Sequence, residues 1–267
     1  MYISIIIPIY NSEETIIQSF GSVYSELHGL GKPFEVILVN DGSTDSSLSI
    51  IQKLAKAHRE VVVISQENGG ASRARNAGLD VAGGEIIGFN DSDDIWVDGS
   101  LEFRLSVLDE YESVDCVVAN HDVDKQSLFF LKSIKKDIFN ITLNAQMFKC
   151  YFSPPTALIR RKILDNSLRF NPILTHAEEG YFFNHVAAQY ICFFINKQSS
   201  KSITQKMRYG ESGLSGSIHK MECGELFNLK NAYKELHHSS TLYTVSVLFS
   251  LVKYLKRVVA VSIRRNF

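Results

Sequence analysis

The sequence predicts an α/β fold built on a doubly wound, mostly parallel sheet. Over the first 120 residues, short β-branched runs alternate with helix-length segments that carry apolar residues on one face. Strands separated by such helices form βαβ units, whose strands run parallel. Polar clusters follow the ends of these strands, where open α/β sheets bind ligands. The length of 267 residues, 45% of them hydrophobic, suits one such domain, alone or with a small appendage.

The first half should hold the parallel strands and the helices that connect them. Strands are expected where β-branched and other apolar residues run together, at residues 3–7, 35–39, 61–65, 85–90 and 114–120. Asn11 can cap the first helix, with Glu14 closing a capping box. The later helices are expected at about residues 44–58, 72–82 and 98–110.

The regular alternation ends after His121. We expect turns at residues 153–155 and 171–172, a short helix from near Glu179, a strand at 190–195 and a Gly- and Ser-rich loop at 210–217. From Met221 onward the chain is expected to be helical.

Composition excludes several functional classes. A formal net charge of −1 gives no global electrostatic basis for binding nucleic acid. The four cysteines are far apart and form no CxxC pair, so they predict neither a zinc site nor a disulfide framework. The apolar run at residues 2–9 is too short to span a bilayer, and no signal peptide is expected.

An acidic cluster follows the fourth expected strand. Asp91, Asp93 and Asp94 lie within four residues. Carboxylates this close repel one another unless protons or a cation neutralise them. Hard cations such as Mg²⁺ or Mn²⁺ take carboxylate oxygens and usually keep phosphate and water ligands as well. The alternative is a solvated acidic turn in which Asp98 caps the next helix.

Other candidate binding residues follow the neighbouring strands. Arg73 and Arg75 could bind phosphate or a nucleotide base through their planar guanidinium groups, or could lie on a solvated helix face. Asp41 could accept a hydrogen bond from a base N–H, or could cap the helix that follows it. Glu14 is a candidate nucleotide contact whose alternative is helix capping.

Four motifs occur in order along the first half. They are Pro8-x-Tyr10-Asn11, Asn40-Asp41-Gly42-Ser43-Thr44-Asp45, Asn68-x-Gly70-x-x-Arg73-x-Arg75-Asn76-x-Gly78 and Asp91-Ser92-Asp93-Asp94. With this order and spacing, residues 2–120 closely resemble the family-2 glycosyltransferases, which have the GT-A fold. The resemblance implies a Rossmann-like nucleotide-binding half, an acceptor-binding half and inverting sugar transfer that uses Mn²⁺ or Mg²⁺.

The resemblance also implies which residues hold the nucleotide. Pro8 and Tyr10 would border the base, Asp41 would bond the uracil ring, and Arg73 would lie near the base and phosphates. The family often has two aspartates where this chain has Asn40 and Asp41. The retained Asp41 is the one expected to touch the base.

Asp91 and Asp93 match the Asp-x-Asp motif of the family. The resemblance implies that Asp91 faces the ribose and sugar and that Asp93 binds the metal. His219 could complete the metal site, as a late histidine does in some GT-A enzymes, or could be an ordinary surface histidine. Arg208 could meet the diphosphate from the same late loop.

A catalytic base is expected in the second half. Inverting transfer needs a carboxylate to take the proton of the acceptor hydroxyl, and the metal stabilises the departing diphosphate. The family supplies this base from a Glu-Asp pair at a helix start, where this chain has Glu178 and Glu179. Glu179 matches the catalytic Asp but is one methylene longer, so either glutamate could be the base. The alternative is a pair of acidic residues that only favours a helix N-terminus.

The tail, residues 242–263, is apolar but has basic residues in its middle. On a helical wheel one side is basic, with Lys253, Lys256, Arg257 and Arg264, and the other is apolar, with Leu251, Val252, Leu255, Val259 and Ile263. This pattern is typical of a helix that lies in an anionic membrane surface. The alternative is a helix packed on the protein's own core with its basic face in solvent.

We therefore expect an inverting, metal-dependent transfer of a sugar from a UDP-sugar to an acceptor hydroxyl. Residues 1–120 would bind the nucleotide sugar, residues 121–220 would bind the acceptor and supply the base, and residues 221–267 would form the helical tail. The acceptor is expected to be a lipid-linked sugar in bacterial O-antigen or capsule synthesis, at the cytoplasmic face of the inner membrane. The alternatives are a sugar nucleotidyltransferase, which would want a Gly-rich phosphate loop after the first strand, and a non-catalytic nucleotide-sugar or carbohydrate-binding protein.

Overall fold

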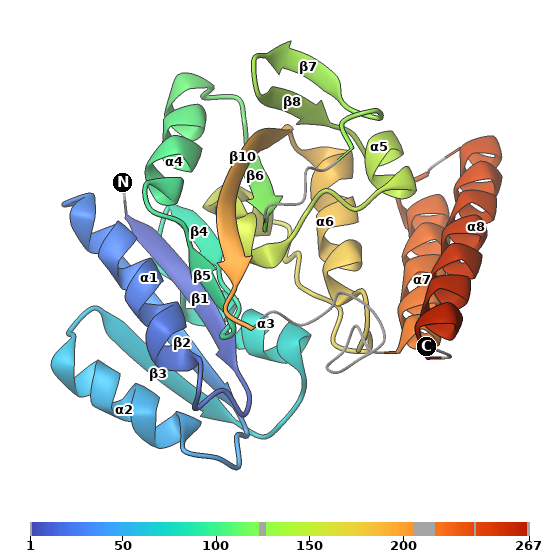
Figure 1. Cartoon of the computed structure of the whole chain (residues 1–267). Helices are drawn as coiled ribbons and strands as arrows, with labels where there is room; N and C mark the ends of the chain where they lie inside the picture. The colour runs from blue at the N-terminus through green and yellow to red at the C-terminus, as the bar shows by residue number, and fades with distance from the viewer. Residues whose placement is uncertain (1, 123–126, 205–216, 238, 266–267) are drawn as a thin grey trace.

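The computed structural model describes residues 2–122, 127–204, 217–237 and 239–265, arranged as an α/β fold with two long helices at one edge (Figure 1). The strands are β1 (Ile3–Ile9), β2 (Phe34–Asp41), β3 (Val61–Gln66), β4 (Ile86–Phe89), β5 (Asp94–Trp96), β6 (Cys116–His121), β7 (Lys132–Lys135), β8 (Ile138–Ile141), β9 (Leu158–Arg160) and β10 (Cys192–Ser202). The α-helices are α1 (Ile16–Gly29), α2 (Ser47–Ala57), α3 (Ala71–Val81), α4 (Ser100–Glu110), α5 (Leu143–Phe148), α6 (Glu178–Gln189), α7 (Ile218–Glu235) and α8 (Ser240–Arg265). Two short 3₁₀ turns, at Pro154–Thr156 and Arg161–Leu164, flank β9.

The strand order shows how the two halves of the domain join. In the described part of the chain, the 10-stranded sheet has the order β3-β2-β1-β4-β9-β6-β10-β8-β7, and β5 pairs with β10. β1 pairs in parallel with β2 and β4, and β2 pairs in parallel with β3. β9 then lies antiparallel between β4 and β6. A strand from the second half is therefore inserted between two strands of the first.

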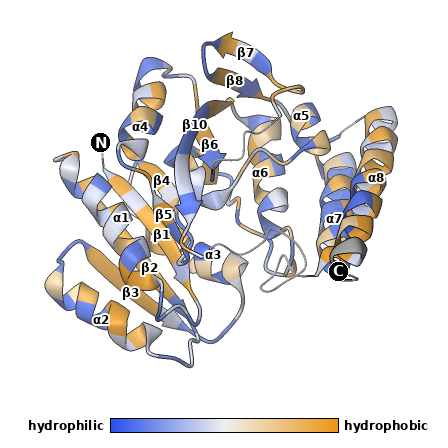
Figure 2. Ribbon diagram, viewed as in Figure 1, coloured by the Kyte–Doolittle hydropathy of each residue, from blue (hydrophilic) through white to orange (hydrophobic). Residues whose placement is uncertain are grey.

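The central strand β1 is covered on both faces. Its side chains alternate between the two faces of the sheet. Ile5 and Ile7 pack with α1, α2 and α4, whereas Ile6 packs with α3 and α6 on the opposite face. Burial on both faces explains why β1 is a nearly continuous apolar run. In Figure 2 the strands β2 and β3 are mostly hydrophobic, whereas the helices carry both hydrophobic and hydrophilic residues.

The predicted fold class is confirmed, and the strands expected in the first half are present with slightly different ends. The predicted capping box is wrong, because α1 begins at Ile16 after Thr15 and no side chain caps it. Asn11 instead has a left-handed backbone (φ 48°), and its side-chain oxygen accepts a hydrogen bond from the N–H of Thr44 (2.8 Å). Asp98 does not cap α4, whose N-cap is Gly99. Strands β5, β7, β8 and β9 and helix α5 were not expected from the sequence.

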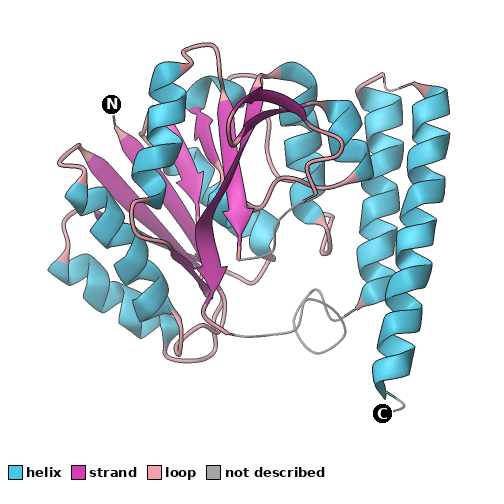
Figure 3. Ribbon diagram, turned by 45° about the horizontal axis from the view of Figure 1, so that its top comes forward, coloured by secondary structure: helices cyan, strands magenta, loops and turns pink. Residues whose placement is uncertain are grey.

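The helices α7 and α8 form a hairpin that stands at one edge of the molecule (Figure 3). Polar side chains occupy much of the interface between them. Ser250 on α8 donates a hydrogen bond to Glu222 on α7 (2.9 Å). Lys253 and Arg257 on α8 both pair with Glu225 on α7, at 3.5 and 2.8 Å. Two basic residues of α8, Lys253 and Arg257, therefore face α7, whereas Lys256 is exposed.

The outward side of α8 is apolar. Leu255 is 60% exposed, Leu248 is 59% exposed and Val259 is 56% exposed. The alternative in which this helix buries its apolar side and exposes its basic side is therefore wrong. Among the described helices, none combines the length and the apolar character needed to cross a membrane.

Candidate functional site

The loops after β1, β2 and β4 are joined at the carboxyl edge of the sheet. The N–H of Glu13 donates to Asp45 (3.0 Å), and the carboxylate of Glu13 accepts from the N–H of Ser46 (2.9 Å). The hydroxyls of Ser12 and Ser92 lie 2.7 Å apart, which ties the first loop to the acidic cluster. The residues predicted after these three strands therefore share one edge, where open α/β sheets bind ligands.

Asp41 ends β2 and is only 3% exposed. Its two carboxylate oxygens accept hydrogen bonds from the N–H groups of Gly69 (2.9 Å) and Gly70 (2.7 Å). These bonds fix the turn between β3 and α3, in which Gly70 has a φ of 85° that suits glycine. Asp41 does not cap the following helix, since the N-cap of α2 is Ser46. The carboxylate is thus held firmly at the predicted base-binding position.

Arg73 lies across the same turn. A Cβ atom at Gly69 would be 2.5 Å from the Cδ of Arg73, so the arginine occupies the space that a larger residue would need. Arg73 is exposed and forms no hydrogen bond or ion pair with any other described residue. Its guanidinium therefore keeps all of its donors for a ligand.

The other predicted nucleotide contacts lie on the first loop. Tyr10 is 50% exposed, and Pro8 at the end of β1 is partly buried. Glu14 is exposed and precedes α1. The contacts of these three residues with a nucleotide stay predictions.

Arg75 links the two halves of the domain. Its guanidinium is 4% exposed and donates to Asp91 after β4 (2.8 Å) and to Glu178 at the start of α6 (3.2 Å). Burial acts to lower the pKa of Arg75, but Asp91 and Glu178 outweigh it, so the net shift is upward. The expectation of a solvated helix face is wrong for Arg75. Its role as a bridge was not predicted, because Glu178 is 103 residues away in the sequence.

The three carboxylates of the acidic cluster have different surroundings. Asp94 is buried against β10, where it accepts a hydrogen bond from the hydroxyl of Ser202 (2.9 Å). Burial, together with the charges of Asp91 and Asp93, raises the pKa of Asp94 to about 8. Asp91 and Asp93 keep part of their surface exposed. Part of each of these two side chains is therefore accessible at the sheet edge.

The cluster fits a hard cation that a substrate helps to hold. Within the described residues, no group of three or more His, Cys, Asp or Glu side chains is placed to hold a metal by itself. Partly exposed carboxylates beside a third one with a raised pKa do mark a place where positive charge is favourable. Mg²⁺ is commonly bound by one or two carboxylates plus substrate phosphates and water, which matches this donor set.

Helix α6 begins with the two candidate bases. Ala177 before it has a left-handed backbone (φ 52°). Glu178 is 8% exposed and paired with Arg75, whereas Glu179 is less deeply buried and has no such partner among the described residues. Burial raises the pKa of Glu179 to about 8, reinforced by the charge of Glu178 and opposed by that of Arg75. A carboxylate with a pKa near the working pH is suited to accept a proton.

Helix α7 braces the segment before these glutamates. The side-chain amide of Asn228 donates to the carbonyl oxygen of Ala177 (2.7 Å). A Cβ atom at Gly224 would lie 2.2 Å from the carbonyl oxygen of His176, so the two backbones touch there. Sequence reasoning missed both residues. Their spacing of four, which places them on one helix face, is the signal that could have found them.

His219 does not join the site in the described structure. His219 is exposed near the start of α7, with its Nε2 3.9 Å from the sulfur of Cys223. Arg208 and most of the predicted Gly- and Ser-rich loop lie outside the described residues. The metal-binding role of His219 stays a prediction.

Comparisons with known proteins identify the family. The model of "Glycosyl transferase family 2" matches residues 4–168. The minor teichoic acid biosynthesis protein GgaA of Bacillus subtilis is 30% identical over 189 residues, which are 68% of this chain and 42% of GgaA. The matched segments make up only 28% and 32% of the length of two Rickettsia glycosyltransferases.

Solved structures show the same fold. The structure of S. aureus TarS 1-349 in complex with UDP-GlcNAc has a TM-score of 0.68 and 25% identity, covering 91% of this chain and 70% of that one. The mannosyltransferase PcManGT from Pyrobaculum calidifontis, in complex with GDP-Man and Mn²⁺, has a TM-score of 0.64 and 17% identity, covering 97% and 75%. The fold, the ordered motifs at the sheet edge and the family match agree: the chain belongs to glycosyl transferase family 2.

Proposed function

We propose that this protein transfers a sugar from a UDP-sugar to an acceptor hydroxyl, with inversion at the anomeric carbon. The observation that carries the proposal is the Arg75 bridge, which links Asp91 at the nucleotide edge to Glu178 at the start of α6. It ties Asp91, the expected sugar-binding carboxylate, to the start of α6, where the proposed base Glu179 directly follows Glu178. A single in-line displacement needs this arrangement of leaving group and base.

The donor would be held at the turn that Asp41 organises. The base would lie against Tyr10 and Asp41, and the diphosphate would meet the free guanidinium of Arg73. The similarity to TarS, whose structure was solved with UDP-GlcNAc, supports uridine as the base. PcManGT, solved with GDP-Man, shares only the fold at 17% identity and so does not argue for guanosine.

Asp93, with Asp91 beside it, would hold Mn²⁺ or Mg²⁺ together with the donor phosphates. When bound, the cation would neutralise the negative charge that develops on the departing diphosphate. Arg73 adds positive charge from the other side of the edge.

Glu179 would be the base, and Glu178 would be a positioning residue. Glu178 is buried and ion-paired with Arg75, so it cannot turn toward an acceptor without removing one partner from the buried guanidinium. Glu179 carries no such tie, and its raised pKa of about 8 suits a group that must take a proton.

The acceptor would be a lipid-linked sugar in polysaccharide synthesis, with the protein lying on the cytoplasmic face of a bacterial inner membrane. The similarity to GgaA supports a surface-polymer pathway. The apolar outward side of α8 supports a membrane surface, since Leu248, Leu255 and Val259 are each more than half exposed. Lys256 is exposed among these apolar residues and would favour anionic lipid.

The membrane part of the proposal is tested by flotation with phosphatidylglycerol vesicles. Replacing Leu248 and Leu255 by Ser should abolish flotation while UDP binding stays unchanged. Added salt should weaken flotation of the natural protein, because lipid charge is screened. If the protein instead forms stable dimers that the same two changes dissociate, α8 is a protein interface and the membrane proposal fails.

The transfer itself is tested with UDP- and GDP-sugars in Mn²⁺. We expect hydrolysis or transfer from a UDP-sugar, tighter binding of UDP than of GDP by calorimetry, and a β-linked product from an α-linked donor. Tighter GDP binding would contradict the proposed base contact. An α-linked product would contradict single displacement.

A further inference from the structure

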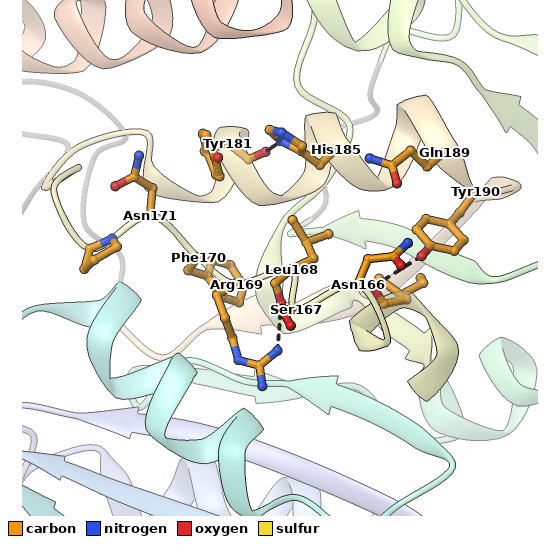
Figure 4. A pocket seen from close by; sticks show the side chains of 12 residues that line it. Asn166, Ser167, Leu168, Arg169, Phe170, Asn171, Tyr181, His185, Gln189 and Tyr190 are labelled. Atoms are coloured by element: carbon orange, nitrogen blue, oxygen red, sulfur yellow. Dashed lines mark hydrogen bonds between the residues drawn. The ribbon is translucent and has the colours of Figure 1, made fainter. Parts of the chain in front are cut away.

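A groove of about 460 Å³ runs along α6 in the second half of the domain (Figure 4). On one side, Tyr181, His185 and Gln189 recur every four residues, so they share a face of α6. The other side is the segment 163–172, which returns along the helix. The groove is separate from the sheet-edge site, because neither Glu178 nor Glu179 lines it.

The lining combines flat apolar surfaces with uncharged polar groups. Tyr181 and Tyr190 offer rings, and Leu168 adds an aliphatic surface. The side-chain amides of Asn166 and Gln189 are exposed and form no hydrogen bond with other described residues. A sugar ring has apolar C–H faces and hydroxyls that both donate and accept, so it can use rings and amides together.

The two basic side chains at the groove, Arg169 and His185, each lie beside a carboxylate. Arg169 binds Asp80 on α3 through two nitrogens, at 3.0 and 2.9 Å. The Nε2 of His185 lies 3.5 Å from a carboxylate oxygen of Glu235 on α7. Among the described residues that line the groove, no cation remains unpaired for a phosphate or carboxylate ligand. The lining therefore favours an uncharged ligand.

Phe170 at the back of the groove is fixed to the nucleotide-binding half. Its backbone N–H and carbonyl both bond the side chain of Asn76, at 2.9 and 2.8 Å. Its ring centroid lies 5.4 Å from the guanidinium carbon of Arg75, the residue that joins Asp91 to Glu178. A ligand in the groove would therefore be held at a fixed position relative to the sheet-edge site.

We propose that this groove binds an uncharged sugar unit of the acceptor glycan, away from the hydroxyl that reacts. The identity of the ligand rests on the proposed transfer to a glycan, whereas the preference for an uncharged sugar rests on the lining alone. The volume lies within the usual range for small-molecule sites, about 300–1,000 Å³.

Saturation-transfer NMR on the full chain, without nucleotide or metal, tests the proposal. The probes are N-acetylglucosamine, its β-1,4-linked trimer, maltotriose and glucose 1-phosphate. We expect at least one neutral probe to bind. Glucose 1-phosphate should bind no more tightly than the neutral probes. The double change Asn166→Ala and Gln189→Ala should weaken that binding about tenfold, as the loss of two neutral hydrogen bonds implies. Gln52→Ala, an exposed amide on α2, is the matched control and should have no effect.

Absence of binding by every neutral probe would overturn the inference, as would unchanged binding by the double variant. Preferential binding of glucose 1-phosphate that the double variant loses would also overturn it, in favour of an anion site. A UDP titration with Mn²⁺ on the same sample separates this outcome from the proposed transfer. If UDP binds but no saccharide does, only the proposed sugar binding in the groove is refuted. If a saccharide binds but UDP does not, the groove proposal is supported and the proposed donor is refuted.

Discussion

The central sheet and the C-terminal hairpin use hydrophobic residues in opposite ways. In β1, Ile5, Ile6 and Ile7 are completely buried between two helical layers. In α8, by contrast, Leu255 is 60% exposed, and the side facing α7 carries Lys253. An apolar stripe therefore predicts a helix with two unlike sides, but it does not say which side the protein covers.

The polar interface of the hairpin is stabilised by paired charge. Burial acts to raise the pKa of Glu225, but Lys253 and Arg257 outweigh it and lower the pKa. Burial raises the pKa of Glu222, which has only the hydroxyl of Ser250 as a hydrogen-bond partner among the described residues. Buried ion pairs are weak contributors to stability but costly to break singly. The hairpin thus combines charge pairing with a small apolar cluster around Leu229 and Ala232, whereas the sheet is held by extensive apolar burial.

In the proposed function the sheet edge carries the chemistry and the hairpin binds the membrane, and a change at Asp93 should separate these two roles most clearly. We expect Asp93→Ala to abolish transfer, because the cation that neutralises the diphosphate loses its ligand. Vesicle flotation should stay normal. Asp98→Ala, an exposed carboxylate on the same loop, is the control and should transfer normally. Full transfer by the Asp93 variant in Mn²⁺, or by the natural protein in excess EDTA, would refute the metal role.

Glu179→Gln should slow turnover by about 10²–10⁴-fold, the usual contribution of general-base catalysis. UDP affinity should stay near normal, since the donor is held on the other half. Glu178→Gln provides the comparison, because it weakens the tie to Arg75 without removing the base. The Glu178→Gln variant should keep measurable transfer activity. Part of its lower activity should come from weaker substrate binding. If Glu178→Gln is dead while Glu179→Gln turns over, the assignments are reversed.

The pH dependence of kcat/KM should report Glu179. Its pKa is raised to about 8, so at lower pH most of the free protein carries a protonated group that cannot accept a proton. Activity should therefore rise with pH, close to tenfold per unit well below the pKa, and level off above it. Initial rates at low donor concentration measure this limb. A flat profile from about pH 6 to 9 would exclude Glu179 as the titrating base.

Two alanine substitutions test the opposite burial directly. Ile6→Ala removes a fully buried side chain and should cost about 2–5 kcal/mol of unfolding free energy. Leu255→Ala removes an exposed side chain and should change stability by less than about 0.5 kcal/mol, yet it should weaken flotation. Urea unfolding of both variants measures the difference. A large loss of stability from Leu255→Ala would mean that the outward side of α8 is covered within the protein.

Pattern and spacing predicted the parallel strands because each is a run of apolar residues, buried along most of its length in β1, β2 and β4. They did not predict β7, whose residues Lys132–Lys135 are all exposed, or β9, which has only 3 residues. Neither strand has the length or alternation that identifies a strand without its partners. The N-cap at Thr15 was not predicted from the sequence. The side chain of Asn11 accepts a hydrogen bond from Thr44 on another loop, so it does not cap the helix.

The candidate site also contains residues that the sequence predicted and residues that it did not. Asp41, Arg73, Asp91 and Asp93 were placed together by the rule that parallel strands end at one edge. The Arg75 bridge and the Asn228 brace depend on contacts across 103 and 51 residues, and no local pattern encodes such contacts. Their side chains were visible in the sequence, but their partners were not.

The position of β9 has a consequence for the order of folding during synthesis. β4 and β6 both leave the ribosome before β9, which later fills the space between them. Until residue 160 is available, one edge of β4 and both edges of β6 lack their partner strands and are open to pairing with other chains. We therefore expect that the first 120 residues do not fold on their own. A truncated chain that ends there should aggregate, whereas one that extends past β10 should remain dispersed, because only the longer chain can close its own sheet.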